Sequence, residues 1–228
     1  SSSVASDVPS QVTGLTATPT INYTVDLAWS APNANGYAVS GYHIESSTDG
    51  GATWTDLEAN TASTTTTYAH INLSAGVTYT YQVSAINTVG SGVASTTVSS
   101  TAGDVPDAPV LTLSALPSNT IQSDWTTPAD NGFAITTYQI ERSADAGTTW
   151  VPVTSVNANT FQDPNLTNSV TYQYKVSATN LVGSSAFSGV VQIVAGNSPG
   201  TVNPLTATTT SNTSIDLAWA TPNPNGYA

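Results

Sequence analysis

The chain has 228 residues, enough for about two domains of ordinary size. Its charge is strongly acidic, with 14 Asp and Glu against 2 Lys and Arg and a net charge of −12. This argues against nucleic acid and anionic membranes as partners, because both require clusters of basic side chains. The lack of Cys excludes disulfides and thiolate metal sites, and no run of about 18 apolar residues predicts membrane insertion.

The apolar residues fall in short runs that alternate with polar ones, which is the pattern of β-strands. Thr, Val, Ile, Tyr and Trp are prominent in these runs, and 16 Gly and 13 Pro interrupt them. We therefore predict an all-β fold in which each unit has about seven short strands, arranged as a Greek-key sandwich.

The chain opens with a Ser-rich segment, residues 1–6, which we predict to be a flexible lead-in. A tripeptide that ends in Pro then opens each of three units, and Pro at a strand start removes no ladder hydrogen bond. No long Gly/Ser linker separates the units, so neighbouring domains should be closely tethered. The predicted domains are 7–103, 104–196 and 197–228, opened by Asp7-Val8-Pro9, Asp104-Val105-Pro106 and Asn197-Ser198-Pro199.

Alternation within the first unit predicts which side chains face inward. The second strand places Val25, Leu27 and Trp29 on one face. Asn35-Gly36 supplies the positive φ angles that the following turn needs, and a last strand is predicted around residues 93–98. The other inward positions are Val12, Leu15, Ala17, Tyr42, Ile44, Tyr79, Tyr81, Val83 and Ala85.

One stretch occurs three times in the chain. DLAWSAPNANGYA at residues 26–38 returns as QSDWTTPADNGFA at 122–134 and as DLAWATPNPNGYA at 216–228. Such self-similarity indicates a tandem array of one domain. Ser123 stands in the inward position that Leu27 holds in the first unit, so we expect slightly poorer packing in the second unit.

The third copy covers only the first two strands of a repeat. Two strands cannot bury a sandwich core, so Ile215, Leu217 and Trp219 should be left in water. Either the array continues beyond this sequence, which is the interpretation that we favour, or another polypeptide completes these strands.

The units resemble fibronectin type III repeats. The shared features are a second-strand Trp followed by Pro, a third-strand Tyr, a Leu six residues before a sixth-strand Tyr, and an Asn-x-x-Gly turn. The resemblance implies tandem seven-stranded immunoglobulin-like β-sandwiches without a catalytic centre, so we do not expect an enzyme. The residues are Trp29/Pro32, Trp125/Pro128, Trp219/Pro222, Tyr42, Tyr138, Leu73/Tyr79, Leu166/Tyr172, Asn87/Gly90 and Asn180/Gly183.

The resemblance also implies a tyrosine corner in each repeat, formed by Leu73/Tyr79 and by Leu166/Tyr172, in which the phenol bonds to nearby backbone. The Thr/Ser-rich, Lys-poor composition is similar to that of repeats in large prokaryotic (archaeal or bacterial) extracellular proteins. No RGD tripeptide is present in the turn before the last strand, where some animal adhesive repeats carry one.

Two hairpins, residues 47–54 and 143–150, fit the S-x-D-x-G-x-T-W pattern known as an Asp box. The physical role of this pattern is to close a turn, with Asp accepting backbone hydrogen bonds and Trp packing beneath. Contact with a sugar or an ion is the alternative. We place the four strand and hairpin tryptophans in the core: Trp29, Trp54, Trp125 and Trp150.

Four N-x-[ST] sequons suggest N-glycosylation, because they recur at equivalent places in the repeats and should lie on exposed turns. Common ancestry of the repeats, with Asn favoured in turns, explains the same pattern without glycans. The candidate residues are Asn22, Asn72, Asn165 and Asn212.

The sequence offers weak metal candidates. Acids near the domain junctions, namely Asp7, Asp104 and Asp107, suggest junctional calcium, although none forms a dense calcium loop. His43 and His70 have no His equivalents in the second unit, so we predict surface positions rather than a metal or base role. We therefore expect no cofactor.

Three aromatic residues in the turn after the second strand do not fit the core pattern. They are equivalent in the three repeats and are expected to contact the neighbouring domain or a partner chain: Tyr37, Phe133 and Tyr227.

The leading functional interpretation is a non-catalytic extracellular structural array, a rod, sheath or filament component on a prokaryotic cell surface. The alternative is an adhesin or a carbohydrate-binding spacer of a larger surface protein or polysaccharide-degrading enzyme. The expected partners are other copies of the chain or other surface proteins, and glycans. An enzyme is disfavoured because no nucleophile–base pair, metal cluster or paired carboxylates recur at a cleft.

Overall fold

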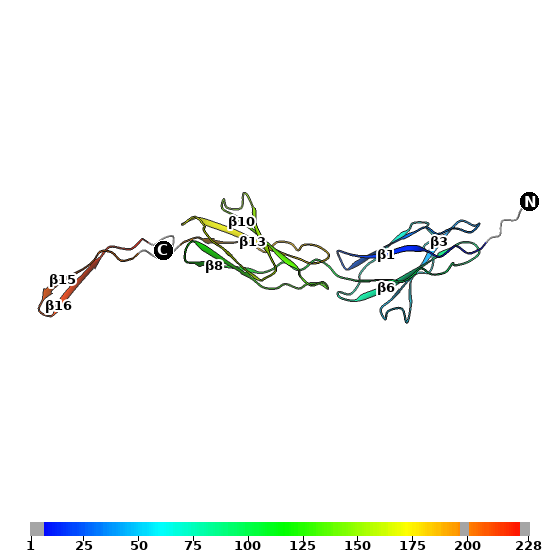
Figure 1. The fold of residues 1–228 in the computed structure, drawn as a ribbon, viewed down its shortest axis with the longest axis horizontal. Helices are drawn as coiled ribbons and strands as arrows, with labels where there is room; N and C mark the ends of the chain where they lie inside the picture. Colours follow the sequence, from blue (N-terminus) through cyan, green and yellow to red (C-terminus); the bar gives the residue numbers. More distant parts are fainter. Residues whose placement is uncertain (1–6, 197–200, 224–228) are drawn as a thin grey trace, which may run out of the picture. The chain divides into compact units, whose positions relative to one another are not determined.

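The computed structural model describes residues 7–196 and 201–223, which contain sixteen β-strands and no helix (Figure 1). The predicted all-β fold is confirmed. No helix in these residues is therefore long and apolar enough to cross a bilayer. The predicted lead-in, residues 1–6, and the tripeptide that opens the third unit lie outside the described residues.

The first repeat contains seven antiparallel strands in two sheets, as predicted. Its three-stranded sheet has the order β1-β2-β5, and its four-stranded sheet has the order β4-β3-β6-β7. The strands are β1 (Thr13–Thr20), β2 (Thr24–Ser30), β3 (Gly41–Ser47), β4 (Thr55–Glu58), β5 (Thr67–His70), β6 (Thr78–Ile86) and β7 (Val98–Thr101).

The core of the first repeat lies between these sheets and follows the predicted period of two. Val25, Leu27 and Trp29 project from β2 and are at most 6% exposed. Tyr42 projects from the opposite sheet, and its ring meets the Trp29 ring edge-on at 5.0 Å. Each such side chain contributes roughly 1.5–3 kcal/mol when it leaves water, so these alternating rows hold the two sheets together.

The second repeat has the same plan, with sheets in the order β8-β9-β12 and β11-β10-β13-β14. Trp125 is buried against Tyr138 in the same edge-on arrangement. Ser123 is completely buried, and its hydroxyl has no hydrogen-bond partner. The strands are β8 (Leu111–Leu116), β9 (Thr120–Trp125), β10 (Thr137–Ser143), β11 (Val151–Val156), β12 (Thr160–Asp163), β13 (Thr171–Thr179) and β14 (Val191–Val194).

The third copy forms a two-stranded hairpin of β15 (Leu205–Ser211) and β16 (Ser214–Trp219). Its apolar side chains lie in solvent, as expected: Leu217 is 57% exposed, whereas the equivalent Leu27 is 1% exposed. The same strand sequence is therefore buried only where a second sheet covers it.

The last strand of the first repeat was predicted in the wrong place. β7 begins at Val98, and Val93 is 68% exposed. The segment before β7 bonds to β6 at irregular intervals, from Gly92 N–H to the Ala85 carbonyl (2.8 Å) and from Ser95 N–H to the Val83 carbonyl (2.9 Å). These backbone groups are satisfied without a regular ladder, so the apolar run there does not form a strand.

The chain packs as two compact units. The first contains β1–β7 and also takes in Asp130–Ile135 and Asn180–Ser184. The second contains β8–β16.

Candidate functional site

The first Asp-box hairpin is closed by its own aspartate. Oδ1 of Asp49 accepts the Thr53 N–H at 2.9 Å and the Ser47 hydroxyl at 2.7 Å, and Oδ2 accepts the Thr53 hydroxyl at 2.5 Å. The Ser47 oxygen in turn accepts the backbone N–H of Gly51 at 2.9 Å. Both carboxylate oxygens are therefore used by the turn itself.

The second hairpin repeats this arrangement. Asp145 accepts the Thr149 N–H at 2.9 Å, the Thr149 hydroxyl at 2.6 Å and the Ser143 hydroxyl at 2.7 Å. Ala146 has a φ of 57°, whereas Gly50 at the same position of the first hairpin has a φ of 76°. The turn thus keeps its left-handed conformation even where the residue is not glycine.

The hydrogen bonds in these hairpins favour the ionised carboxylates. The Thr53 hydroxyl, followed by the Ser47 hydroxyl, lowers the pKa of Asp49 well below its ordinary value. The Thr149 hydroxyl is the main cause that lowers the pKa of Asp145 to about 2. Bonds to the charged form lower a carboxyl pKa in this way, so turn closure accounts for both aspartates without a sugar or an ion.

Two of the four tryptophans predicted to lie in the core are not there. Trp29 and Trp125 are buried, but Trp54 and Trp150 are only half-buried. Trp54 lies under its own hairpin, where a Cβ added to Gly51 would be 3.2 Å from the indole. The reason is that hairpin tryptophans follow the turn that they support, and that turn lies outside the space between the sheets.

Trp150 also contacts a part-buried cation, Lys175. The Lys175 ammonium lies 4.3 Å from the Trp150 ring centroid and 4.3 Å from that of Phe187. Lys175 also pairs with Glu141 at 3.0 Å. This cluster was not predicted from the sequence, because its members come from two separate strands and two loops.

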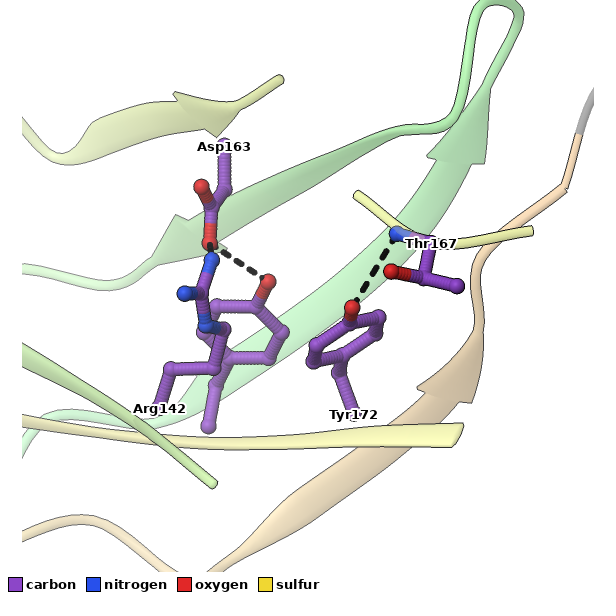
Figure 2. A network of polar contacts seen from close by, with 5 residues as sticks. Arg142, Asp163, Thr167 and Tyr172 are labelled. Atoms are coloured by element: carbon purple, nitrogen blue, oxygen red, sulfur yellow. Dashed lines mark hydrogen bonds and ion pairs between the residues drawn. The ribbon is translucent and has the colours of Figure 1, made fainter. Parts of the chain in front are cut away.

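Both tyrosine corners have the geometry that the family resemblance implies. The Tyr79 hydroxyl accepts the backbone N–H of Ser74 at 3.3 Å. The Tyr172 hydroxyl accepts the backbone N–H of Thr167 at 3.1 Å, as Figure 2 shows. Leu73 and Leu166 are buried beside these bonds. The corners tie the connection before the sixth strand of each repeat to that strand.

A charged network lies beside the second tyrosine corner (Figure 2). Oδ2 of Asp163 is 2.7 Å from the Arg142 guanidinium and accepts the Tyr174 hydroxyl at 2.8 Å. Asp163 and Tyr174 are buried. Burial, followed by the bond to Asp163, raises the pKa of Tyr174. Arg142 and Tyr174 satisfy the buried carboxylate, so loss of either partner would leave part of a buried charge uncompensated.

The first repeat fills the same place with a histidine. His70 is half-buried, and its Nδ1 lies 3.2 Å from the Tyr81 hydroxyl. Its ring meets those of Tyr79 and Tyr81 edge-on, and burial lowers its pKa. The predicted surface position of His70 is therefore wrong, because its strand turns this side chain against the tyrosines.

The Asn of the Asn-x-x-Gly turn joins three backbone segments in each repeat. In the first repeat, Nδ2 of Asn87 donates to the carbonyls of Asp7 (2.8 Å) and Ala34 (3.2 Å), and Oδ1 accepts the N–H groups of Val89 and Gly90. Asn180 makes the equivalent bonds in the second repeat. The motif therefore has a structural role that the spacing alone did not reveal.

The four sequon asparagines are exposed in the structure. Asn22, Asn72 and Asn165 have φ angles of 60°, 59° and 61°, which place them at turn positions. Asn212 lies between β15 and β16 and is also exposed. Their positions satisfy the requirement for exposure, and glycosylation itself stays a prediction.

The turn aromatics are in different environments. Tyr37 is 47% exposed. Phe133 is half-buried within the first compact unit, where a Cβ added to Gly103 would lie 2.6 Å from its ring. Tyr227 lies outside the described residues. Contact with a neighbouring domain or a partner chain stays a prediction for all three.

Among the described residues, the structure brings together one group of metal-ligand residues, of which the sequence analysis considered only His43 and predicted no metal role for it. His43, Glu45 and Asp56 place one ligand atom each within 4.8 Å of one another. The junction acids Asp7 and Asp104 instead accept the backbone N–H of the next residue. His43 and Glu45 lie on one face of β3 because they are two residues apart, but only the pairing of β3 with β4 brings Asp56 beside them.

One surface depression, of about 370 Å³, lies along β2 and β5. Its ionisable lining side chains are Asp26 and Tyr68. Its other lining residues are Leu27, Ala28, Thr67 and Ala69.

Two antiparallel sheets of three and four strands, joined by a tyrosine corner, define each repeat as an immunoglobulin-like β-sandwich. The family called "Fibronectin type III domain" matches residues 10–101 and 107–194. The chain belongs to this family, whose domains are generally non-catalytic modules.

The chain is similar to parts of much longer proteins. It is 30% identical over 228 residues to Exoglucanase B of Cellulomonas fimi, and 28% identical over 226 residues to Protein sidekick-1 of Homo sapiens. The matches cover 92% and 93% of this chain but only 19% and 10% of those proteins. The crystal structure of chicken CNTN1 FN1-FN3 domains matches with a TM-score of 0.53 and 21% identity, over 83% of this chain and 69% of that one. This last match shows the fold alone.

Proposed function

We propose that the chain is a non-catalytic extracellular spacer that separates other parts of a larger surface or secreted protein. The observation that carries this proposal is that the acidic and phenolic side chains described above form hydrogen bonds within their own repeat. Asp49, Asp145, Asp163 and both corner tyrosines bond to their own repeat. These groups stabilise separate sandwiches and are not directed at a substrate.

The relatives support the same function. Exoglucanase B and Protein sidekick-1 are several times longer than the part that matches this chain. Repeats of this kind therefore occur within proteins of different names and different overall lengths. The match in Cellulomonas fimi also supports a prokaryotic source. A spacer needs only a stable fold and a soluble surface, and the acidic charge supplies the second of these.

A second candidate is a structural or adhesive array in which copies of the chain contact one another, as in a rod, sheath or filament. The exposed ring of Tyr37 favours it, because the aromatic residue recurs at the same position of each repeat. An exposed aromatic ring can anchor a partner chain.

Three measurements on the purified chain separate these functions. A spacer should sediment as a monomer, show no retention on insoluble cellulose or chitin, and have a maximum dimension by X-ray scattering about twice that of one sandwich. Self-association that a Tyr37→Ser variant abolishes would replace the spacer with the array. Saturable retention on the polysaccharide would replace it with a carbohydrate-binding module.

A further inference from the structure

Three metal-ligand side chains meet on the outer face of the four-stranded sheet of the first repeat. His43 and Glu45 lie on β3, and Asp56 lies on the neighbouring edge strand β4. Nε2 of His43 is 2.7 Å from Oδ1 of Asp56. All three ligand atoms lie within 4.8 Å of one another. The cluster is independent of the Asp-box hairpin and of the tyrosine corner.

The strand pairing explains why these side chains converge. His43 and Glu45 are two residues apart on one strand, so they project from the same face. The pairing of β3 with β4 is irregular: Ile44 pairs with Glu58, but Glu45 pairs with Asp56. This bulge places a second carboxylate directly opposite Glu45, with the imidazole beside both.

The two carboxylates lack the cation that the second repeat supplies at the equivalent position. Glu141 faces Lys175 across β10 and β13 and pairs with it at 3.0 Å. Glu45 faces Gln82, whose amide donates to Oε2 of Glu45 at 2.7 Å. The first repeat contains no Lys or Arg at all. Like charges opposite each other on paired strands are destabilising. A cation bound at this face would offset the repulsion between Glu45 and Asp56.

We propose that His43, Glu45 and Asp56 bind one divalent ion of a late first-row transition metal, with zinc as the representative. One imidazole nitrogen and two carboxylate oxygens suit zinc, whereas calcium and magnesium take six or more oxygen ligands. Ligands of a tetrahedral zinc ion are about 3.3 Å apart. The His43–Asp56 pair therefore separates slightly, the Glu45 side chain moves in, and solvent takes the fourth position.

The test is a titration of the complete chain with zinc sulfate, followed by calorimetry and by imidazole NMR. The chain has only two histidines, so the signals of His43 and His70 can be assigned separately. We expect one zinc ion per chain and a shift of the His43 signals, with those of His70 unchanged. Calcium chloride in place of zinc should give no saturable binding.

Variants locate the site. His43→Gln and Asp56→Asn should each weaken zinc binding by roughly tenfold or more, because each removes one of three ligands. Gln stands at the position of His43 in the second repeat, which shows that the fold accepts it. Glu58→Gln is the matched control: it removes one charge from the same strand outside the cluster and should change the affinity less than twofold.

Four results would overturn the proposal. They are no saturable zinc binding, binding that shifts His70, calcium binding tighter than zinc binding, and an equal loss of affinity in Glu58→Gln and Asp56→Asn. The last result would mean that zinc is attracted by the overall negative charge of the sheet and is not held by these three ligands. Circular dichroism confirms that each variant is folded, and Glu45→Gln replaces any variant that is not.

Discussion

Tyr174 donates its hydroxyl hydrogen bond to Oδ2 of Asp163 at 2.8 Å, and the same oxygen holds the Arg142 guanidinium at 2.7 Å. The first repeat has His70 and Tyr81 in the corresponding places, 3.2 Å apart. One fold therefore supports a charged network in one repeat and an uncharged pair in the other. The two repeats should respond differently to mutation and to pH.

Asp163→Asn should destabilise the second repeat by about 2–4 kcal/mol, because it leaves the part-buried guanidinium without its counter-charge. Hydrogen exchange followed by mass spectrometry measures this change, since its peptides report on each repeat separately. Asp124→Asn, on the exposed face of β9, is the control and should change stability by less than about 1 kcal/mol. Equal effects of the two variants would contradict a role for the network.

The stability of the first repeat should fall in acid because of His70. Burial lowers the pKa of His70 below its ordinary value of 6.5. Below pH of about 6.5 the unfolded chain therefore binds a proton that the folded repeat takes up less readily. The contribution of neutral His70 to the stability of the first repeat is complete above a pH of about 6.5 and is lost as the pH falls through the pKa of His70 in the folded repeat.

Urea unfolding of the first repeat at a series of pH values between 7 and 5 tests the His70 prediction. The wild-type repeat should lose more stability over this range than His70→Gln, in which no group titrates at this position. Parallel pH profiles for the two proteins would show that His70 titrates as it does in the unfolded chain.

Removal of a corner hydroxyl should cost about 0.5–1.5 kcal/mol in each repeat, because one backbone N–H loses its partner. Tyr172→Phe should cost more than Tyr79→Phe, since the Tyr172 bond is shorter, 3.1 Å against 3.3 Å, and its side chain is more buried. Thermal unfolding of the two variants beside the wild type gives both values. The opposite order would show that the bond length does not set the energy.

Ser123→Ala should stabilise the second repeat by about 1 kcal/mol, because it removes a buried hydroxyl that has no partner. Leu27→Ala, at the same position of the first repeat, should instead cost about 2–5 kcal/mol, since it leaves a cavity. Urea unfolding distinguishes the two changes. A loss of stability in Ser123→Ala would mean that this hydroxyl is hydrogen-bonded in solution.

The sequence alone determined the class of fold, the repeat period and most of the inward positions. Alternation with a period of two assigns Val25, Leu27 and Trp29 to one face whatever the rest of the chain does, because successive side chains of a strand point to opposite sides. The turn at Asn35-Gly36 was likewise predicted from neighbouring residues alone, and both residues have the positive φ that it requires.

Only the tertiary structure decided which side chains from different strands meet. The pairing of Glu45 with Asp56 depends on a bulge in the register, and Asp163 meets Arg142 because two sheets face each other. Trp54 and Trp150 were also predicted to lie in the core, yet their turns hold them outside it. Local periodicity fixes the direction of a side chain along its own strand, whereas contacts between strands depend on register and on how the sheets pack.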